Sequence, residues 1–524
     1  MPTRPHIVIF NPDQFRADAL GHLGNPAART PVLDSLVESD AVSFDSAFCQ
    51  NPVCTPSRCS FMTGWYPHVL GHRTMYHMLH AEREQPNLLS RLKENGYFVW
   101  WGGKNDLLPG QDGHATACDV YYRPTAEDFA RWGHESRPGL HSWTDWRGPR
   151  DGDNFYSFYA GRLPTGDDDI YCDNDWANVL GAIDFIDAYD GEQPICIYLP
   201  LLYPHPPYGV EEPWFSAIDR SAIPERIPAP ADWKAAGKPS ILQGIADGQG
   251  IEGWSEERFT ELRATYHGMC SRIDHQFGLV IDALKARGLY DDTAIFFFSD
   301  HGDFTGDYGL VEKTQNTFED ALTRVPLVVK PPRRDAAGVP VVTAAGVRRT
   351  IAELVDFPAT VYELTGIEPG YRHFGRSLLP SIADPAVTHR DEAHCEGGRL
   401  VGEEEAMEAS SAARFADPTD SLYYPRTRLQ MSDDEPWHTK ATMVRTDRWK
   451  YVRRLYERDE LYDLAADPGE QRNLIDDPAL RDDPALRDDP ALRAVLLDLK
   501  ERMLTWYQET ADTVPFALDE RGFA

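Results

Sequence analysis

Residues 6–14 read HIVIFNPDQ, and residues 294–301 read AIFFFSDH. Each stretch begins with a short apolar run, His6–Phe10 and Ala294–Phe298, and ends in polar residues that include an aspartate. An unbroken apolar run of this length is typical of a strand buried on both faces of a sheet. Open α/β sheets place their ligands just beyond the carboxyl ends of such strands. The two stretches therefore predict a buried sheet with a functional site at its edge.

The same pattern continues through the first 390 residues. Other short apolar runs predict strands at Tyr97–Trp101, Ile195–Leu199 and Val325–Val329. Longer segments between the strands predict helices at Pro31–Ser39, near Leu88–Glu94 and at Glu256–Arg287. Strands that alternate with helices favour a parallel sheet covered on both faces. We expect an α/β fold, with a large mixed, mostly parallel sheet sandwiched by helices.

The pattern changes near residue 390. Met443–Arg454 alternates like a β-hairpin, and the short strand-like segment Glu460–Leu464 follows it. We therefore expect two domains: a large α/β domain at residues 1–390, and a smaller C-terminal α+β subdomain with an antiparallel sheet at residues 391–524. The segment DDPAL occurs three times between Asp476 and Leu492, and Asp-Asp-Pro is typical of a helix start.

Net charge excludes several partners. The chain has 524 residues and a formal net charge of −32 at pH 7. This charge opposes binding to nucleic acid and to anionic membranes, so neither partner is expected.

No apolar run approaches the ~18 residues of a membrane span, and we see no signal-peptide core, so a cytoplasmic protein is expected. The eight cysteines contain no CxxC pair, which predicts free, mostly buried thiols.

The most specific motif runs from Cys54 to Gly64 and reads CTPSRCSFMTG. It matches Cys-x-Pro-Ser-Arg-x-x-x-x-Thr-Gly at every fixed position and resembles the signature of formylglycine-dependent sulfatases in the alkaline phosphatase superfamily. The resemblance implies that a separate maturation enzyme oxidises Cys54 to formylglycine (3-oxoalanine). One hydroxyl of the hydrated aldehyde would attack sulfur, and the second would expel sulfate by re-forming the aldehyde. Arg58 would stabilise the anionic nucleophile.

A second group of residues suits a divalent cation. Asp13, Gln14, Asp300 and His301 supply two carboxylates, an amide oxygen and an imidazole. Such ligands suit Ca²⁺ most simply, with Mn²⁺ or Mg²⁺ as alternatives because one ligand is nitrogen. The Asp-Gln…Asp-His combination resembles the sulfatase branch that contains choline sulfatases, phosphonate monoester hydrolases and some sugar sulfatases.

Three more positions resemble the family's substrate-binding residues. Lys313 follows His301 by twelve residues, as the family's sulfate-binding lysine does. His205 lies in a Pro-His-x-Pro loop, where the resemblance implies that it binds sulfate or protonates the leaving oxygen. Lys104 lies in GKNDL, where family members often read Gly-Lys-Trp-His-Leu and use the lysine to bind sulfate.

Asp106 departs from the family pattern. It stands where the family has the histidine that helps to deprotonate the formylglycine hydroxyl. Asp106 is therefore one candidate for this base, and His77, His72 or His68 are others. Asp106 is alternatively a substrate-contacting residue, a role for which His77 is also a candidate.

The combined motifs predict a sulfuric ester hydrolase that cleaves a sulfated sugar or another small sulfated alcohol. The alternative is a phosphonate monoester or phosphodiester hydrolase with the same site, because these esters also carry one negative charge. A catalytically inactive binding protein is disfavoured, because it predicts loss of Cys54, Asp300 or Lys313. The sequence leaves the oligomeric state open, including a homo-oligomer.

Overall fold

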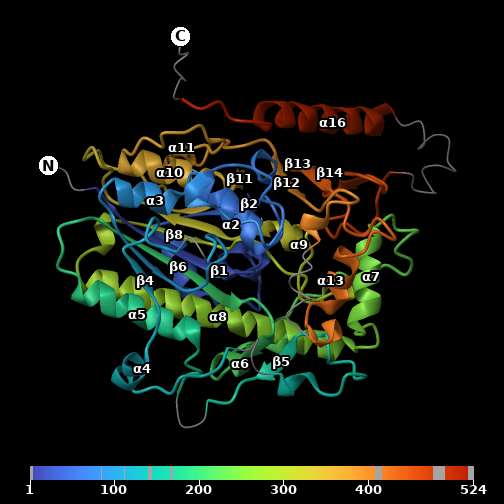
Figure 1. Ribbon diagram of the computed structural model, residues 1–524, viewed down its shortest axis with the longest axis horizontal. Helices are drawn as coiled ribbons and strands as arrows, with labels where there is room; N and C mark the ends of the chain where they lie inside the picture. The colour runs from blue at the N-terminus through green and yellow to red at the C-terminus, as the bar shows by residue number, and fades with distance from the viewer. Residues whose placement is uncertain are drawn as a thin grey trace, which may run out of the picture.

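A mixed nine-stranded sheet forms the centre of the molecule (Figure 1). The computed structural model describes residues 4–83, 85–110, 113–139, 144–165, 169–407, 416–475 and 490–516. The strand order is β11-β2-β10-β8-β1-β6-β3-β4, and β9 pairs with β2. The strands are β1 (His6–Asp13), β2 (Val42–Phe48), β3 (Phe98–Gly102), β4 (Val120–Tyr122), β6 (Ile195–Pro204), β8 (Thr293–Phe298), β9 (Arg324–Val325), β10 (Leu327–Lys330) and β11 (Gly346–Glu353). In the described sheet, antiparallel pairing is confined to β9 and β10, which confirms the predicted mostly parallel sheet.

Both faces of the sheet are buried. Along β1, Ile7 and Ile9 belong to one hydrophobic core, whereas Val8 and Phe10 belong to a second core on the opposite face. Figure 1 shows α2, α3 and α10 over one face, and α5 and α8 over the other. The helix bounds are α1 (Pro31–Ser39), α2 (Cys54–Thr63), α3 (Leu88–Glu94), α4 (Ala126–Trp132), α5 (Asn174–Ala188), α6 (Trp214–Ala217), α7 (Ser240–Gln249), α8 (Glu256–Ala286), α9 (Asp320–Thr323), α10 (Asp356–Thr365) and α11 (Leu379–Ala383). Within the described ranges, no helix has the length and apolar character needed to cross a bilayer.

The C-terminal part contains the predicted antiparallel sheet. Its strands, in the order β12-β13-β14-β15, are β12 (Ala393–Gly397), β13 (Ala441–Arg445), β14 (Trp449–Arg454) and β15 (Glu460–Asp463). Two helices accompany this sheet, α13 (Tyr424–Gln430) and α16 (Pro490–Thr510). Trp506 of α16 packs against Tyr66 and His394. The division into domains at residues 390 and 391 stays a prediction.

A separate two-stranded sheet consists of β5 (Tyr159–Arg162) and β7 (Tyr208–Val210). Most of the DDPAL repeat lies outside the described residues, and Pro490 from its last copy is the first residue of α16. All eight cysteines lie in the described ranges, where they are buried thiols that form no disulfide, as predicted.

Two strands end later than expected, and these differences affect the site. β1 continues to Asp13 and β6 continues to Pro204, so Asp13 ends its strand and His205 directly follows its own. The strand expected at 325–329 is divided at Pro326 into β9 and β10, because proline has no N–H to donate to a neighbouring strand.

Candidate active site

Four buried side chains meet at the carboxyl ends of the central strands. β1 and β8 are adjacent and parallel, so Asp13 at the end of β1 lies near Asp300 and His301, which follow β8. Cys54 is the first residue of α2. Single ligand atoms of Asp13, Cys54, Asp300 and His301 all lie within 4.8 Å of one another. The fold therefore brings the predicted nucleophile and three of the four predicted cation ligands together.

Cys54 lies among polar groups although it is buried. Its Sγ is 3.2 Å from His301 Nε2, 3.4 Å from Lys104 Nζ and 3.5 Å from Asp13 Oδ1. The N-terminus of α2 favours negative charge at this position. Burial and the charge of Asp13 nevertheless raise the pKa of the Cys54 thiol far above its usual range. The unmodified side chain is therefore a neutral thiol at pH 7.

Arg58 holds the two acidic side chains in place. It lies one helical turn after Cys54, on the same face of α2. Its Nε donates to Asp300 Oδ2 at 3.0 Å, and its NH2 group donates to Asp13 Oδ2 at 3.1 Å. Its NH1 group donates to Asn11 Oδ1 at 2.9 Å. The hydrogen bonds of Arg58 thus tie α2 to the ends of β1 and β8.

The donor atoms at this centre fit a hard divalent cation. His301 Nε2 is 3.6 Å from Asp13 Oδ1 and 3.8 Å from Asp300 Oδ1. His301 Nδ1 donates to the carbonyl oxygen of Gly302 at 2.9 Å, which leaves the lone pair on Nε2 facing the carboxylates. Burial lowers the pKa of His301 and favours the neutral ring that a metal requires. Two buried carboxylates and one imidazole lone pair are suitable ligands for Ca²⁺, Mn²⁺ or Mg²⁺.

Gln14 joins the centre through both its backbone and its side chain. Its φ of 69° lies in the left-handed region, and its backbone N–H donates to Asp300 Oδ1 at 3.1 Å. The side-chain Oε1 accepts a hydrogen bond of 2.7 Å from Lys313 Nζ, and Nε2 donates to the carboxylate of Asp303. The amide oxygen of Gln14 therefore contacts Lys313 here, and its role as a cation ligand stays a prediction.

Lys104 links Asp106 to the centre. Its Nζ lies 2.5 Å from Asp13 Oδ2 and 2.7 Å from Asp106 Oδ2. Although burial favours neutral Asp13, the positive charges of Lys104 and Arg58 hold the pKa of Asp13 well below its usual range. The ammonium group of Lys104 thus contacts both Asp106 and the Cys54 thiol.

The histidines proposed as substitutes for Asp106 lie in different surroundings. His77 is exposed, and its Nδ1 is 2.6 Å from the Thr74 hydroxyl oxygen. His68 Nδ1 is 2.6 Å from Glu396 Oε1, and Nε2 is 2.9 Å from the backbone oxygen of Thr510. His72 is buried, and burial lowers its pKa to about 4. His68 is therefore engaged with the C-terminal part of the chain, and the roles of His72 and His77 stay predictions.

Lys313 and His205 lie next to each other at the site, where Lys313 also contacts Gln14. Lys313 Nζ is 2.9 Å from His205 Nε2 and 2.9 Å from Glu312 Oε1. Glu312 Oε2 in turn accepts a hydrogen bond of 2.8 Å from Arg426. Arg426 also donates to the Lys313 backbone oxygen at 3.3 Å. All four residues are buried, so Arg426 from the C-terminal part fixes the position of Lys313 through Glu312.

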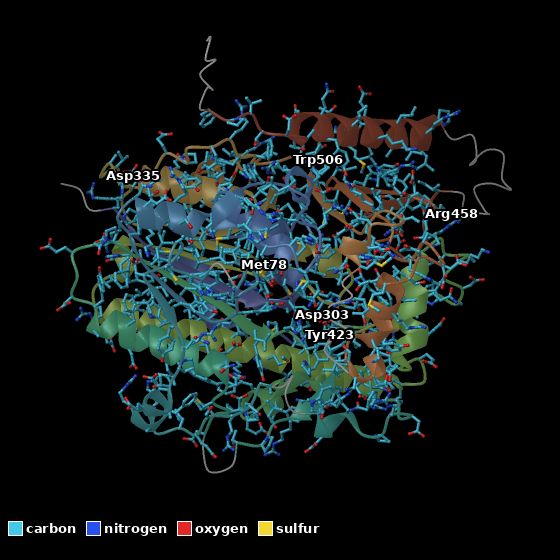
Figure 2. All side chains as sticks on the ribbon, viewed as in Figure 1. Met78, Asp303, Asp335, Tyr423, Arg458 and Trp506 are labelled. Atoms are coloured by element: carbon cyan, nitrogen blue, oxygen red, sulfur yellow. The ribbon has the colours of Figure 1, made fainter. Side chains whose placement is uncertain are left out.

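Sequence reasoning missed Asp303, Glu312, Tyr423 and Arg426. The Tyr423 and His205 rings meet edge to face at 6.5 Å, and Tyr208 donates to Asp303 at 2.7 Å. Figure 2 shows Asp303 and Tyr423 beyond one end of the central strands, near α13. The one sequence feature that could have identified Glu312 is its position next to Lys313. No local pattern marks Arg426, which is separated from Glu312 by 114 positions in the chain.

Comparison with known proteins identifies related sequences and folds. The family model described as Sulfatase matches residues 5–367. The multifunctional alkaline phosphatase superfamily protein PehA of Trinickia caryophylli is 26% identical over 97% of this chain and 96% of its own length. Choline-sulfatase of Rhizobium meliloti is 26% identical over 91% of this chain and 83% of its own length. The structure of phosphonate monoester hydrolase of Agrobacterium radiobacter has a TM-score of 0.70 at 23% identity, over 97% of this chain and 96% of that chain, which shows a common fold.

We predict that Arg426→Ala destabilises the protein. The change leaves one oxygen of buried Glu312 without its guanidinium partner, and breaking a buried ion pair in this way costs about 3–5 kcal/mol. Thermal unfolding measures the loss. Arg428→Ala is the matched control, because Arg428 lies exposed on the same helix and donates a hydrogen bond to the Gly244 backbone oxygen, whose loss costs about 1 kcal/mol. Equal shifts of the two unfolding midpoints would contradict the role of Arg426.

Proposed function

Because this chain belongs to the sulfatase family and is a sulfuric ester hydrolase, we propose that it hydrolyses the sulfate monoester of a sugar or another small alcohol at Cys54. The observation that carries the proposal is the convergence of Cys54 with Asp13, Asp300 and His301 within 4.8 Å. The charges of Lys104 and Lys313 both act on Cys54, which suits an anionic sulfuryl group.

We propose that a maturation enzyme converts Cys54 to formylglycine. Supporting this, the motif from Cys54 to Gly64 is intact, and the raised pKa of the thiol makes an unmodified cysteine a poor nucleophile. The hydrated aldehyde supplies an attacking oxygen together with a route that releases sulfate without attack by water.

We also propose that Asp13, Gln14, Asp300 and His301 hold one divalent cation, most simply Ca²⁺. A cation at this position stabilises negative charge on the nucleophile and on the sulfuryl oxygens. Arg58 serves the same centre indirectly, because it orients the carboxylates of Asp13 and Asp300.

His205 is the residue proposed to protonate the leaving oxygen. Its Nδ1 donates to the backbone oxygen of Pro206 at 2.6 Å, so Nε2 is the atom that can hold or release a proton toward the substrate. Nε2 accepts from Lys313 Nζ at 2.9 Å. An incoming sulfate would compete for the Lys313 ammonium and release Nε2 from this hydrogen bond. Nε2 must then take up a proton before it can protonate the leaving oxygen.

The alternative function is hydrolysis of a phosphonate monoester or phosphodiester. It is favoured by the Asp-Gln…Asp-His combination and by the likeness in fold to a phosphonate monoester hydrolase. The ratio of kcat/KM for an aryl sulfate to that for an aryl phosphonate ester separates the two functions. A ratio well above one supports the sulfatase, and a ratio well below one supports the alternative.

We predict that Cys54 is oxidised when the protein is co-expressed with a maturation enzyme. Oxidation replaces the CH2SH side chain of Cys54 with CHO. The mass of the tryptic peptide of residues 30–58 should fall by the difference between these two groups. Cys49, in the same peptide, is the internal control and should still react with an alkylating reagent. A fully active enzyme whose Cys54 remains a thiol would defeat this proposal.

We predict that Asp300→Ala removes the cation and nearly all turnover. One carboxylate ligand is lost, and Arg58 loses one of its two acidic partners. Elemental analysis gives the metal content per chain, and Asp300→Asn keeps the side-chain shape in case the alanine variant unfolds. Asp282→Ala, on the exposed side of α8, is the control. Stoichiometric metal in both Asp300 variants would show that the ligands are wrongly assigned.

We predict that Asp106→Asn slows product release, since its carboxylate would no longer take up a proton near Lys104. The expected result is one rapid equivalent of alcohol followed by a slow steady state, with a lower kcat. Rapid-mixing kinetics with an aryl sulfate measures the burst. A raised KM with no burst would make Asp106 a substrate-contacting residue and would return the role of base to the histidines.

A further inference from the structure

Asp303 is a fully buried carboxylate whose two oxygens have different partners. Its Oδ2 accepts a hydrogen bond from the side-chain Nε2 of Gln14. Its Oδ1 accepts three others, from the Tyr208 hydroxyl at 2.7 Å, from the Thr305 hydroxyl at 2.7 Å and from the Thr305 backbone N–H. Although burial raises the pKa of Asp303, the hydroxyls of Tyr208 and Thr305 favour its charged form. One oxygen is therefore held in place by three donors, and the other faces Gln14.

These contacts allow one orientation of the Gln14 amide. The carboxylate of Asp303 can only accept a hydrogen bond, so it faces the NH2 group of Gln14. The ammonium group of Lys313 can only donate, and its Nζ lies 2.7 Å from Gln14 Oε1. The backbone N–H of Gln14 donates to Asp300 Oδ1 at 3.1 Å, so the residue lies beside a proposed cation ligand. Asp303 and Lys313 thus fix which end of the amide each of them meets.

Tyr208 extends this hydrogen-bonded network to the segment that carries Lys313. The Tyr208 hydroxyl donates to Asp303, and its oxygen accepts from the backbone N–H of Glu312 at 3.0 Å. Gln14 and Glu312 both have a φ of 69°, in the left-handed region that residues other than glycine rarely adopt. Such backbone conformations persist only where the surrounding contacts impose them. The contacts of Asp303 therefore reach both of these segments at the site.

We propose that Asp303 is a positioning residue that orients the Gln14 amide, so that its oxygen faces Lys313 and the proposed cation site. The inference rests on the proposed cation site and adds the residue that determines which atom Gln14 presents there. A reversed amide would present its NH2 group to the ammonium of Lys313 and to the cation, and neither of them accepts a hydrogen bond. Loss of a hydrogen bond that orients a metal ligand typically lowers metal affinity about 10–100-fold.

Asp303→Asn tests this orientation with little change in side-chain size. The three donors of Tyr208 and Thr305 should keep the amide oxygen of the new side chain at the position of Oδ1. Its NH2 group would then face Gln14, whose amide would reverse to offer its oxygen. We expect the dissociation constant for the cation to rise about 10–100-fold. Competition with a chromophoric chelator measures it, for whichever of Ca²⁺, Mn²⁺ and Mg²⁺ the native protein binds most tightly.

A second change should restore the affinity. When Gln14→Glu is combined with Asp303→Asn, the new amide at position 303 can donate to one carboxylate oxygen at position 14, and the other oxygen faces Lys313. The double variant keeps the native net charge, and its dissociation constant should fall about tenfold or more below that of Asp303→Asn alone. Thr305→Ala is the matched control. It removes a donor to Oδ1 but leaves the oxygen that faces Gln14, so its dissociation constant should stay near the native value.

Thermal unfolding of the metal-free protein gives a second measurement of the same contact. Gln14→Glu alone places two buried carboxylates against each other, and Asp303→Asn alone places two NH2 groups there before the amide reverses. Each single change should lower the unfolding midpoint, and the double variant should lie closer to the native protein than the sum of the two shifts predicts.

The outcomes separate this inference from the proposal on which it rests. If the native protein binds none of the three cations, the proposed cation site fails, and the unfolding midpoints still decide whether Asp303 orients Gln14. Additive midpoint shifts, native cation affinity in Asp303→Asn, or a double variant that binds no more tightly than Asp303→Asn would overturn the positioning role. Weak binding in Asp303→Asn that is restored in the double variant supports it.

Discussion

The buried ion pairs between Arg58 and the aspartates at positions 13 and 300 are the interaction on which the site depends. They connect α2, β1 and β8, three elements that approach from different parts of the chain. Two buried carboxylates would otherwise repel each other in a medium of low dielectric constant. Because Arg58 follows Cys54 by one helical turn, the same contacts fix the nucleophile against the strand ends. The same ion pairs therefore hold these elements together and position the nucleophile.

The remaining charges extend this arrangement in two directions. Lys104 connects the centre to Asp106. Lys313 connects it through Glu312 to Arg426 in the C-terminal part. An anionic substrate would thus lie between two lysines, each held by carboxylates that preserve its charge. Such preorganised charge is the largest contribution that a protein usually makes to the transfer of an anionic group.

The central strands and several helices could be predicted from sequence, because their burial leaves continuous or periodic apolar patterns. The bounds of α1 and α3 agree with those expected. The ends of β1 and β6 were placed too early, since the polar and proline residues there resemble loop sequence although their backbones still pair. Arg426 was missed for another reason. Its importance depends on Glu312, a partner 114 positions away in the chain, and such a contact leaves no local pattern.

The position of β1 also has a consequence during synthesis. Its two neighbours in the sheet are β6 and β8, and its pairing with Thr293 of β8 joins residues roughly 290 positions apart. At the ribosome's rate of ~5–20 residues per second, this first strand waits roughly 15 to 60 s for its second neighbour. Throughout that interval, at least one edge of the apolar strand β1 has no hydrogen-bonded neighbour. Exposed apolar surface and an unpaired strand edge are the features that make a nascent chain prone to aggregation and dependent on chaperones.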